Sequence, residues 1–121
     1  MPIRQIVLSP NSILDKPCQK VTDINTEVKE IIQDLKDTIE SSETPAAGLA
    51  ANQIGINKQI CLVREFFPGE NEGEETYKEY ILINPIIKVS SQKQALDWEG
   101  CLSVPDTFGL VKRFKKIKIV Q

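Results

Sequence analysis

Apolar side chains recur at helical spacing between Thr26 and Ser41. That spacing places them on one face, which predicts an amphipathic helix. Asp23, Asn25 or Thr26 could cap its start. Its end is expected near Ser41 and Ser42, because proline in the Thr44-Pro45 step disfavours helical backbone in the residue before it. The apolar residues are Val28, Ile31, Ile32, Leu35 and Ile39.

Short apolar runs rich in β-branched residues follow the helix. Residues 59–64, 80–84 and 86–89 predict strands, and residues 115–121 alternate apolar and basic side chains as a half-exposed strand does. Residues 67–78, which include four glutamates, are expected to form an exposed acidic hairpin loop between the first two strands. No repeat or linker divides the chain, so the sequence predicts one α+β domain over residues 1–121.

Composition narrows the function classes. The chain has 121 residues, 15 Lys and Arg against 17 Asp and Glu, and no histidine. The net charge of −2 offers no basic field, so direct nucleic-acid binding is not expected. Without histidine, this chain cannot supply a Ser-His or Cys-His catalytic pair or an imidazole metal ligand.

The cellular setting follows from the first residues and from the cysteines. The apolar run at residues 6–8 is too short for a signal peptide or a membrane span, so we expect a cytoplasmic protein. Cys18, Cys61 and Cys101 are odd in number and widely spaced, which favours reduced thiols over disulfides.

Two segments combine glycine with small neighbours and a side chain that could act as a ligand or donor, at residues 48–55 and 99–105. Taken alone, Gln53 would be interpreted as a polar core residue bonded to backbone, and Cys101 as a small buried hydrophobe. Trp98, beside the second segment, is expected to serve packing. Each segment by itself is thus a modest functional signal.

Together and in this order, the segments resemble the first two of the three motifs of the peptide deformylases. The first family motif runs Gly-x-Gly-Leu-Ala-Ala-x-Gln; residues 48–53 match it, while Ala46 stands at its first glycine. The second, Glu-Gly-Cys-Leu-Ser, is matched throughout by residues 99–103. The Asn84-Pro85 step and the Val111-x-Arg113 stretch extend the resemblance over nearly the whole chain. The combination is far more specific than either motif alone.

The resemblance implies metal-dependent removal of the formyl group from the N-terminal methionine of nascent, ribosome-associated polypeptides. In the family, a cysteine and two histidines bind Fe²⁺, or Zn²⁺, Ni²⁺ or Co²⁺ in its place. Cys101 would be that metal ligand here. The Gln53 amide and the Leu102 N–H would stabilise the developing oxyanion. Gly48 would pair with the substrate peptide as an added strand.

The third family motif, His-Glu-x-x-His on a C-terminal helix, has no match in this sequence. The resemblance therefore implies a deformylase-like fold, antiparallel sheets around an N-terminal amphipathic helix, that is C-terminally incomplete. This chain alone is expected to be inactive and not to bind the metal stably. The alternative is a catalytically dead, deformylase-like peptide-binding protein. An uncovered sheet face could also lead to self-association.

One further contact is predicted within the second segment. In the family, the glutamate before Gly-Cys-Leu-Ser is held by an arginine downstream, and Arg113 stands at the matching place. We therefore expect a bidentate Glu99–Arg113 ion pair that supports the loop carrying Cys101.

Overall fold

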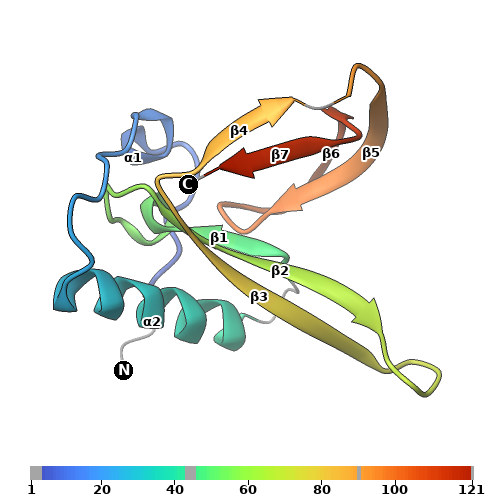
Figure 1. Cartoon of the computed structure of the whole chain (residues 1–121), viewed down its shortest axis with the longest axis horizontal. Coiled ribbons are helices and arrows are strands. Elements are labelled where there is room, and N and C mark those ends of the chain that lie inside the picture. Colours follow the sequence, from blue (N-terminus) through green and yellow to red (C-terminus); the bar gives the residue numbers. More distant parts are fainter. Residues whose placement is uncertain (1–3, 43–45, 90, 121) are drawn as a thin grey trace.

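The computed structural model describes residues 4–42, 46–89 and 91–120 (Figure 1). Thr44, Pro45 and Gln121, which enter the predictions above, lie outside these residues. The elements in chain order are α1 (Ser12–Asp15), α2 (Thr26–Ser41), β1 (Gly48–Ala50), a 3₁₀ turn η1 (Ala51–Ile54), β2 (Ile60–Pro68), β3 (Glu75–Ile83), β4 (Ile86–Val89), β5 (Gln94–Cys101), β6 (Val104–Phe114) and β7 (Ile117–Val120).

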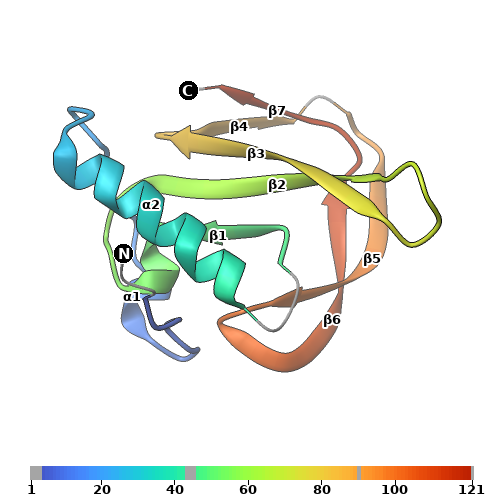
Figure 2. The same ribbon diagram turned by 90° about the horizontal axis from the view of Figure 1, so that it is seen from below.

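The strands form three antiparallel sheets. One has the order β1-β2-β3, and the other two are the ribbons β4-β7 and β5-β6. Helix α2 lies along one side of the three-stranded sheet, and the two ribbons lie on its other side (Figures 1 and 2). The predicted α+β class with antiparallel sheets is therefore confirmed.

Helix α2 has the predicted bounds, and Asn25 is its cap. The Asn25 side chain accepts a hydrogen bond of 3.0 Å from the Val28 N–H, which satisfies one of the free donors of the first turn. Its apolar face packs on β1, η1 and β2, and this layer is the core of the described protein. The buried apolar residues are Val28, Ile31, Leu35, Ile39, Leu49, Ala51, Ile54, Ile60 and Leu62.

Polar contacts join the helix to the same sheet. The Arg64 side chain on β2 is 10% exposed and binds Glu40 of α2 at 2.8 Å and Glu79 of β3 at 3.0 Å. Its guanidinium also lies 4.3 Å from the centre of the Tyr77 ring. One cation thus links three elements at the outer end of the core.

The Asn84-Pro85 step turns the chain from β3 into β4. Asn84 has a positive φ of 51°, a conformation that asparagine tolerates better than most residues. Its side chain donates to the Val21 carbonyl and accepts from the Val21 N–H, both at 2.8 Å. The asparagine therefore also fastens the segment before α2 to the end of the sheet.

The structure corrects two predictions and adds a hairpin that was not predicted. Strands β2 and β3 pair from Ile60 with Ile83 out to Pro68 with Glu75, so the acidic hairpin loop spans only residues 69–74. Residues 94–101 and 104–114 form a long hairpin that the mixed polar and apolar pattern did not reveal. Trp98 is 66% exposed, so the expectation that it serves packing is wrong for the described residues.

Candidate functional site

The first motif forms an edge strand followed by a tight turn. Gly48–Ala50 (β1) pairs antiparallel with β2 at the end of the sheet, and Ala51–Ile54 then makes one 3₁₀ turn. A Cβ at Gly48 would lie 3.0 Å from the Leu62 carbonyl oxygen, tighter than ordinary van der Waals contact. Gly55 ends the turn with φ of 83°, a conformation that favours glycine. The small residues of the motif therefore serve close backbone packing.

The second motif occupies the closed end of the β5-β6 hairpin. Strand β5 ends at Cys101, the pairing register shifts between Gly100 and Cys101, and residues 102–103 form the turn into β6. The Phe108 ring lies over Gly100, where a Cβ would come within 2.7 Å of the ring. Cys101 is exposed, so it is not the buried hydrophobe that a lone cysteine suggests.

The fold brings the two motifs into contact through Gln53. Its Oε1 accepts a hydrogen bond of 3.0 Å from the Ala50 N–H, which directs Nε2 toward the hairpin. Nε2 donates to Cys101 Sγ at 3.4 Å and to Ser103 Oγ at 3.2 Å. Gln53 is thus bonded to backbone, as the simpler interpretation holds, and is also placed beside the Cys101 thiol.

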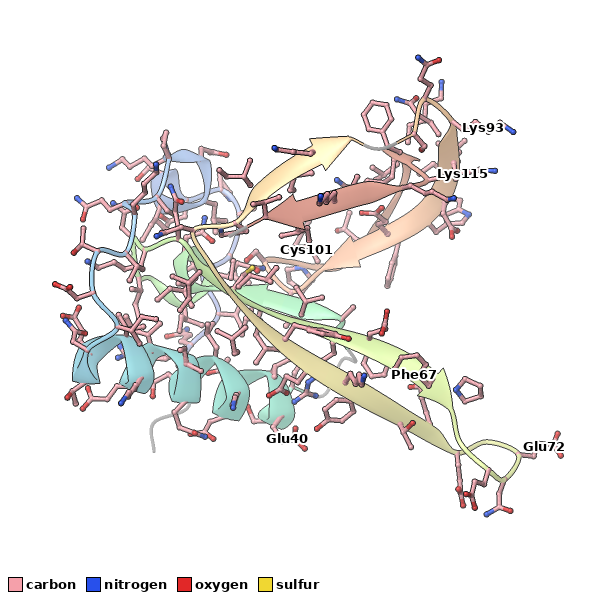
Figure 3. The ribbon with its side chains drawn as sticks, in the orientation of Figure 1. Glu40, Phe67, Glu72, Lys93, Cys101 and Lys115 are labelled. Atoms are coloured by element: carbon pink, nitrogen blue, oxygen red, sulfur yellow. The ribbon has the colours of Figure 1, made fainter. Side chains whose placement is uncertain are left out.

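A cavity of about 310 Å³ opens at this junction. Gly48, Gln53, Cys101 and Leu102 all line it, and the Phe108 ring contributes to its wall. Figure 3 shows Cys101 between the three-stranded sheet and the β5-β6 ribbon. The residues predicted for the metal, the oxyanion and the peptide backbone therefore share one hollow with a largely apolar lining.

The predicted Glu99–Arg113 ion pair is present. Arg113 Nε and Nη2 donate to the two carboxylate oxygens of Glu99 at 2.9 and 2.8 Å. Glu99 pairs with Gly109 and Arg113 with Ala95, so the two side chains meet along the β5-β6 hairpin rather than directly across it. The Arg113 hydrogen bonds lower the pKa of Glu99, and the same bonds raise that of Arg113. The pair is a bidentate brace on the strand that ends at Cys101.

A catalytic metal needs more ligands than this hollow provides. Among residues 4–42, 46–89 and 91–120, no three cysteine, aspartate or glutamate side chains cluster as metal ligands. Glu99 faces Arg113, which leaves Cys101 as the candidate ligand of the second motif. The described residues therefore do not fit a three-ligand metal site.

Two features of the site were not predicted. Ser103 belongs to the second motif but received no role, although it is 3% exposed and bonded to Gln53. Phe108 lines the cavity, and the one sign of this in the sequence was its position a few residues after the motif.

The thiols of Cys18, Cys61 and Cys101 are free, as predicted, and burial raises the pKa of Cys61. No helix of the described chain is long and apolar enough to cross a membrane.

Comparisons with known proteins concern the family and the fold of the whole chain. The family profile described as polypeptide deformylase matches residues 3–121. The chain is 41% identical to peptide deformylase 2 of Clostridium perfringens over 98% of its own length and 70% of that protein. It is also 41% identical to the peptide deformylase of Aquifex aeolicus, covering 97% of this chain and 65% of that one.

A solved structure has the same fold. The structure of a probable peptide deformylase from Synechococcus phage S-SSM7 superposes with a TM-score of 0.79 and 33% identity. The match covers 96% of this chain and 74% of that one. The chain therefore corresponds to about two thirds to three quarters of the length of these relatives.

Proposed function

The chain belongs to the polypeptide deformylase family, and on that premise we propose that it takes part in hydrolysing the formyl group from the N-terminal methionine of nascent polypeptides. The observation that carries this proposal is the placement of Gln53. Its amide nitrogen points at Cys101 inside a cavity that Gly48 and Leu102 also line. This is the part of a deformylase site that binds the peptide and its reacting carbonyl.

The roles follow from the chemistry of each group. Hydrolysis of a formamide places negative charge on the formyl oxygen, which fixed N–H donors stabilise. We assign this to the Gln53 side-chain amide and the Leu102 N–H. In the described chain β1 is the end strand of its sheet, so a peptide could pair beside Gly48 as an added strand. Glu99 and Arg113 would support the strand that presents Cys101.

The described residues do not provide enough ligands to hold the catalytic metal. The family metal would supply an activated water, with Cys101 as one ligand. One thiolate does not hold such an ion as three protein ligands do. We therefore propose that this chain alone binds formylated peptides without hydrolysing them and does not retain Fe²⁺, Zn²⁺, Ni²⁺ or Co²⁺ stably.

A second candidate function is suggested by a site that has peptide-binding and oxyanion residues but lacks a full set of metal ligands. The peptide-binding and oxyanion residues are together, whereas the described residues bring one metal ligand. A catalytically dead, deformylase-like protein that binds formylated peptide ends would have this combination. In either case we propose a cytoplasmic partner of nascent chains, and self-association through exposed sheet faces remains a proposal.

The test is peptide binding with a formyl-specific control. N-formylmethionyl-alanine should shift the NMR signals of Gln53 and Leu102, and N-acetylmethionyl-alanine should shift them less, because its methyl group crowds the carbonyl. Gln53→Ala should weaken binding, whereas Gln33→Ala, on the outer face of α2, should not. No binding of the formyl peptide would refute the proposal. Formate release by the metal-supplemented chain would refute its inactivity and the second candidate.

A further inference from the structure

Ser103 belongs to the second motif and has no role in the proposed function. Its side chain is buried at 3% exposure, at the turn that follows Cys101 and Leu102. Ser103 Oγ accepts a hydrogen bond of 3.2 Å from Gln53 Nε2. A buried hydroxyl is normally placed where it has a partner, and here that partner is the side-chain amide of Gln53, which also contacts the Cys101 thiol.

The backbone near the start of the described chain hydrogen-bonds to both Gln53 and Ser103. The Val7 N–H donates to the Gln53 carbonyl at 2.7 Å, and the Ser9 N–H donates to the Ser103 carbonyl at 2.8 Å. In extended backbone, residues two apart point their amides to the same side. Leu8 between them is 53% exposed. The segment 7–9 therefore spans η1 and the hairpin turn as a strap.

Arg4, three residues before the strap, is bonded to helix α2. The Arg4 N–H donates to Thr38 Oγ1 at 2.9 Å, and Arg4 Nε pairs at 2.9 Å with Asp34, whose side chain is 3% exposed. Residues 4–9 thus connect both motifs to helix α2.

We propose that Ser103 is a positioning residue for the Gln53 amide, and that the backbone of residues 7–9 sets the spacing between that amide and Cys101. The inference deepens the proposed function and rests on it for its catalytic meaning. Two opposed contacts define the amide: the Ala50 N–H at its oxygen and Ser103 Oγ at its nitrogen. With both in place, Nε2 cannot turn away from the cavity, and the donor is oriented before a substrate arrives.

The direct readout is the side-chain amide signal of Gln53 in ¹H–¹⁵N spectra of the full chain. In the unsubstituted protein we expect slow hydrogen exchange of this amide. Ser103→Ala should accelerate that exchange at least fivefold, and Ser103→Thr, which retains the hydroxyl, should restore part of the protection. The matched control is Ser41→Ala, which removes a hydroxyl hydrogen bond of 2.9 Å at the end of α2 and should leave the Gln53 signal unchanged.

A merely structural role would lower stability without moving the Gln53 signal selectively. If Gln53 exchange is unchanged in Ser103→Ala, or changes equally in Ser41→Ala, the positioning role is overturned. Should Ser103→Ala fail to fold, Ser103→Cys provides a nearly isosteric variant with a weaker acceptor, and it should give an intermediate exchange rate.

Binding of N-formylmethionyl-alanine separates this inference from the proposed function. Weaker binding by Ser103→Ala, by about tenfold, together with faster Gln53 exchange, supports both. Faster exchange in a protein whose unsubstituted form binds no formyl peptide would overturn the proposed function and leave the positioning of Gln53 intact. Equal binding and equal exchange would overturn the positioning alone.

The strap has its own internal control. The Val7 and Ser9 amides should exchange more slowly than the Leu8 amide between them, although the segment belongs to no helix or strand. In Ser103→Ala, the Ser9 and Arg4 amides should both keep their protection, because the Ser9 N–H bonds the backbone carbonyl of residue 103, which alanine retains. Equal exchange at positions 7, 8 and 9 would show that the strap does not hold in solution.

Discussion

Replacing Leu35 by alanine tests whether the α2 layer is the core that carries the site. Leu35 is 0% exposed and packs from α2 toward β2, where Leu62 is also 0% exposed. Truncating a buried leucine costs about 2 to 5 kcal/mol. We expect about 3 to 4 kcal/mol, because the paired strands beneath cannot collapse far into the space. A chain of this length has about 6 to 18 kcal/mol of stability, and nine buried apolar residues place it near the lower end.

The assay is urea unfolding followed by far-ultraviolet circular dichroism. Leu35→Ala should remove about half of the free energy of unfolding at an unchanged m value, and lower the melting temperature by about 12 to 16 °C. Leu96→Ala is the matched control, because Leu96 is 58% exposed; it should cost less than about 0.5 kcal/mol. Equal effects of the two substitutions, or unfolding without a cooperative transition, would refute the assignment of the core and the existence of a stable binding domain.

Three further predictions concern polar groups. Arg64→Leu should cost about 1 to 3 kcal/mol in urea unfolding, because Glu79, whose side chain is 22% exposed, loses the cation at 3.0 Å and keeps Lys36 at 3.8 Å; Glu40→Gln, at a side chain 68% exposed, should cost less than about 0.5 kcal/mol. Since burial raises the pKa of Cys61, its alkylation should begin at higher pH than that of an unfolded cysteine, and this thiol should lower stability as pH rises above about 8.5. Arg113→Lys should leave the melting temperature nearly unchanged but accelerate amide exchange at residues 100–102.

Helical periodicity and runs of apolar residues were sufficient for several elements, including β4, although Ile86 and Ile87 in it are 57% and 64% exposed. Helix α2 has one buried face and was predicted to the residue, and β2 and β4 were found from their apolar runs. The β5-β6 hairpin was not predicted: Leu96 and Trp98 alternate with Asp97 and Glu99, but the alternation extends over only four residues. Strand formation there depends on cross-strand pairing, which a single sequence does not display.

The site residues were identified by motif, and their geometry depended on contacts between distant segments. The Glu99–Arg113 pair could be predicted because the family resemblance joins the glutamate of the second motif to a downstream arginine, and the two side chains carry opposite charge. The role of Ser103 could not, since its partners Gln53 and Ser9 come from two other parts of the chain. A serine in a turn has many possible partners, and only the folded arrangement selects one.

The distribution of burial implies that the site can loosen while the fold persists. The buried apolar residues lie between Val28 and Leu62, and Ser103 is the buried residue of the described chain beyond them. Gln53 is therefore carried by the core, while Cys101 is carried by a hairpin joined to it at Ser103 and Leu102. Segments with few buried contacts open at lower free energy than the core. Amides of β5 and β6 should accordingly exchange by local opening, and those of α2 and β2 by global unfolding. Equal protection in the two groups would show that the hairpin and the core form one cooperative unit.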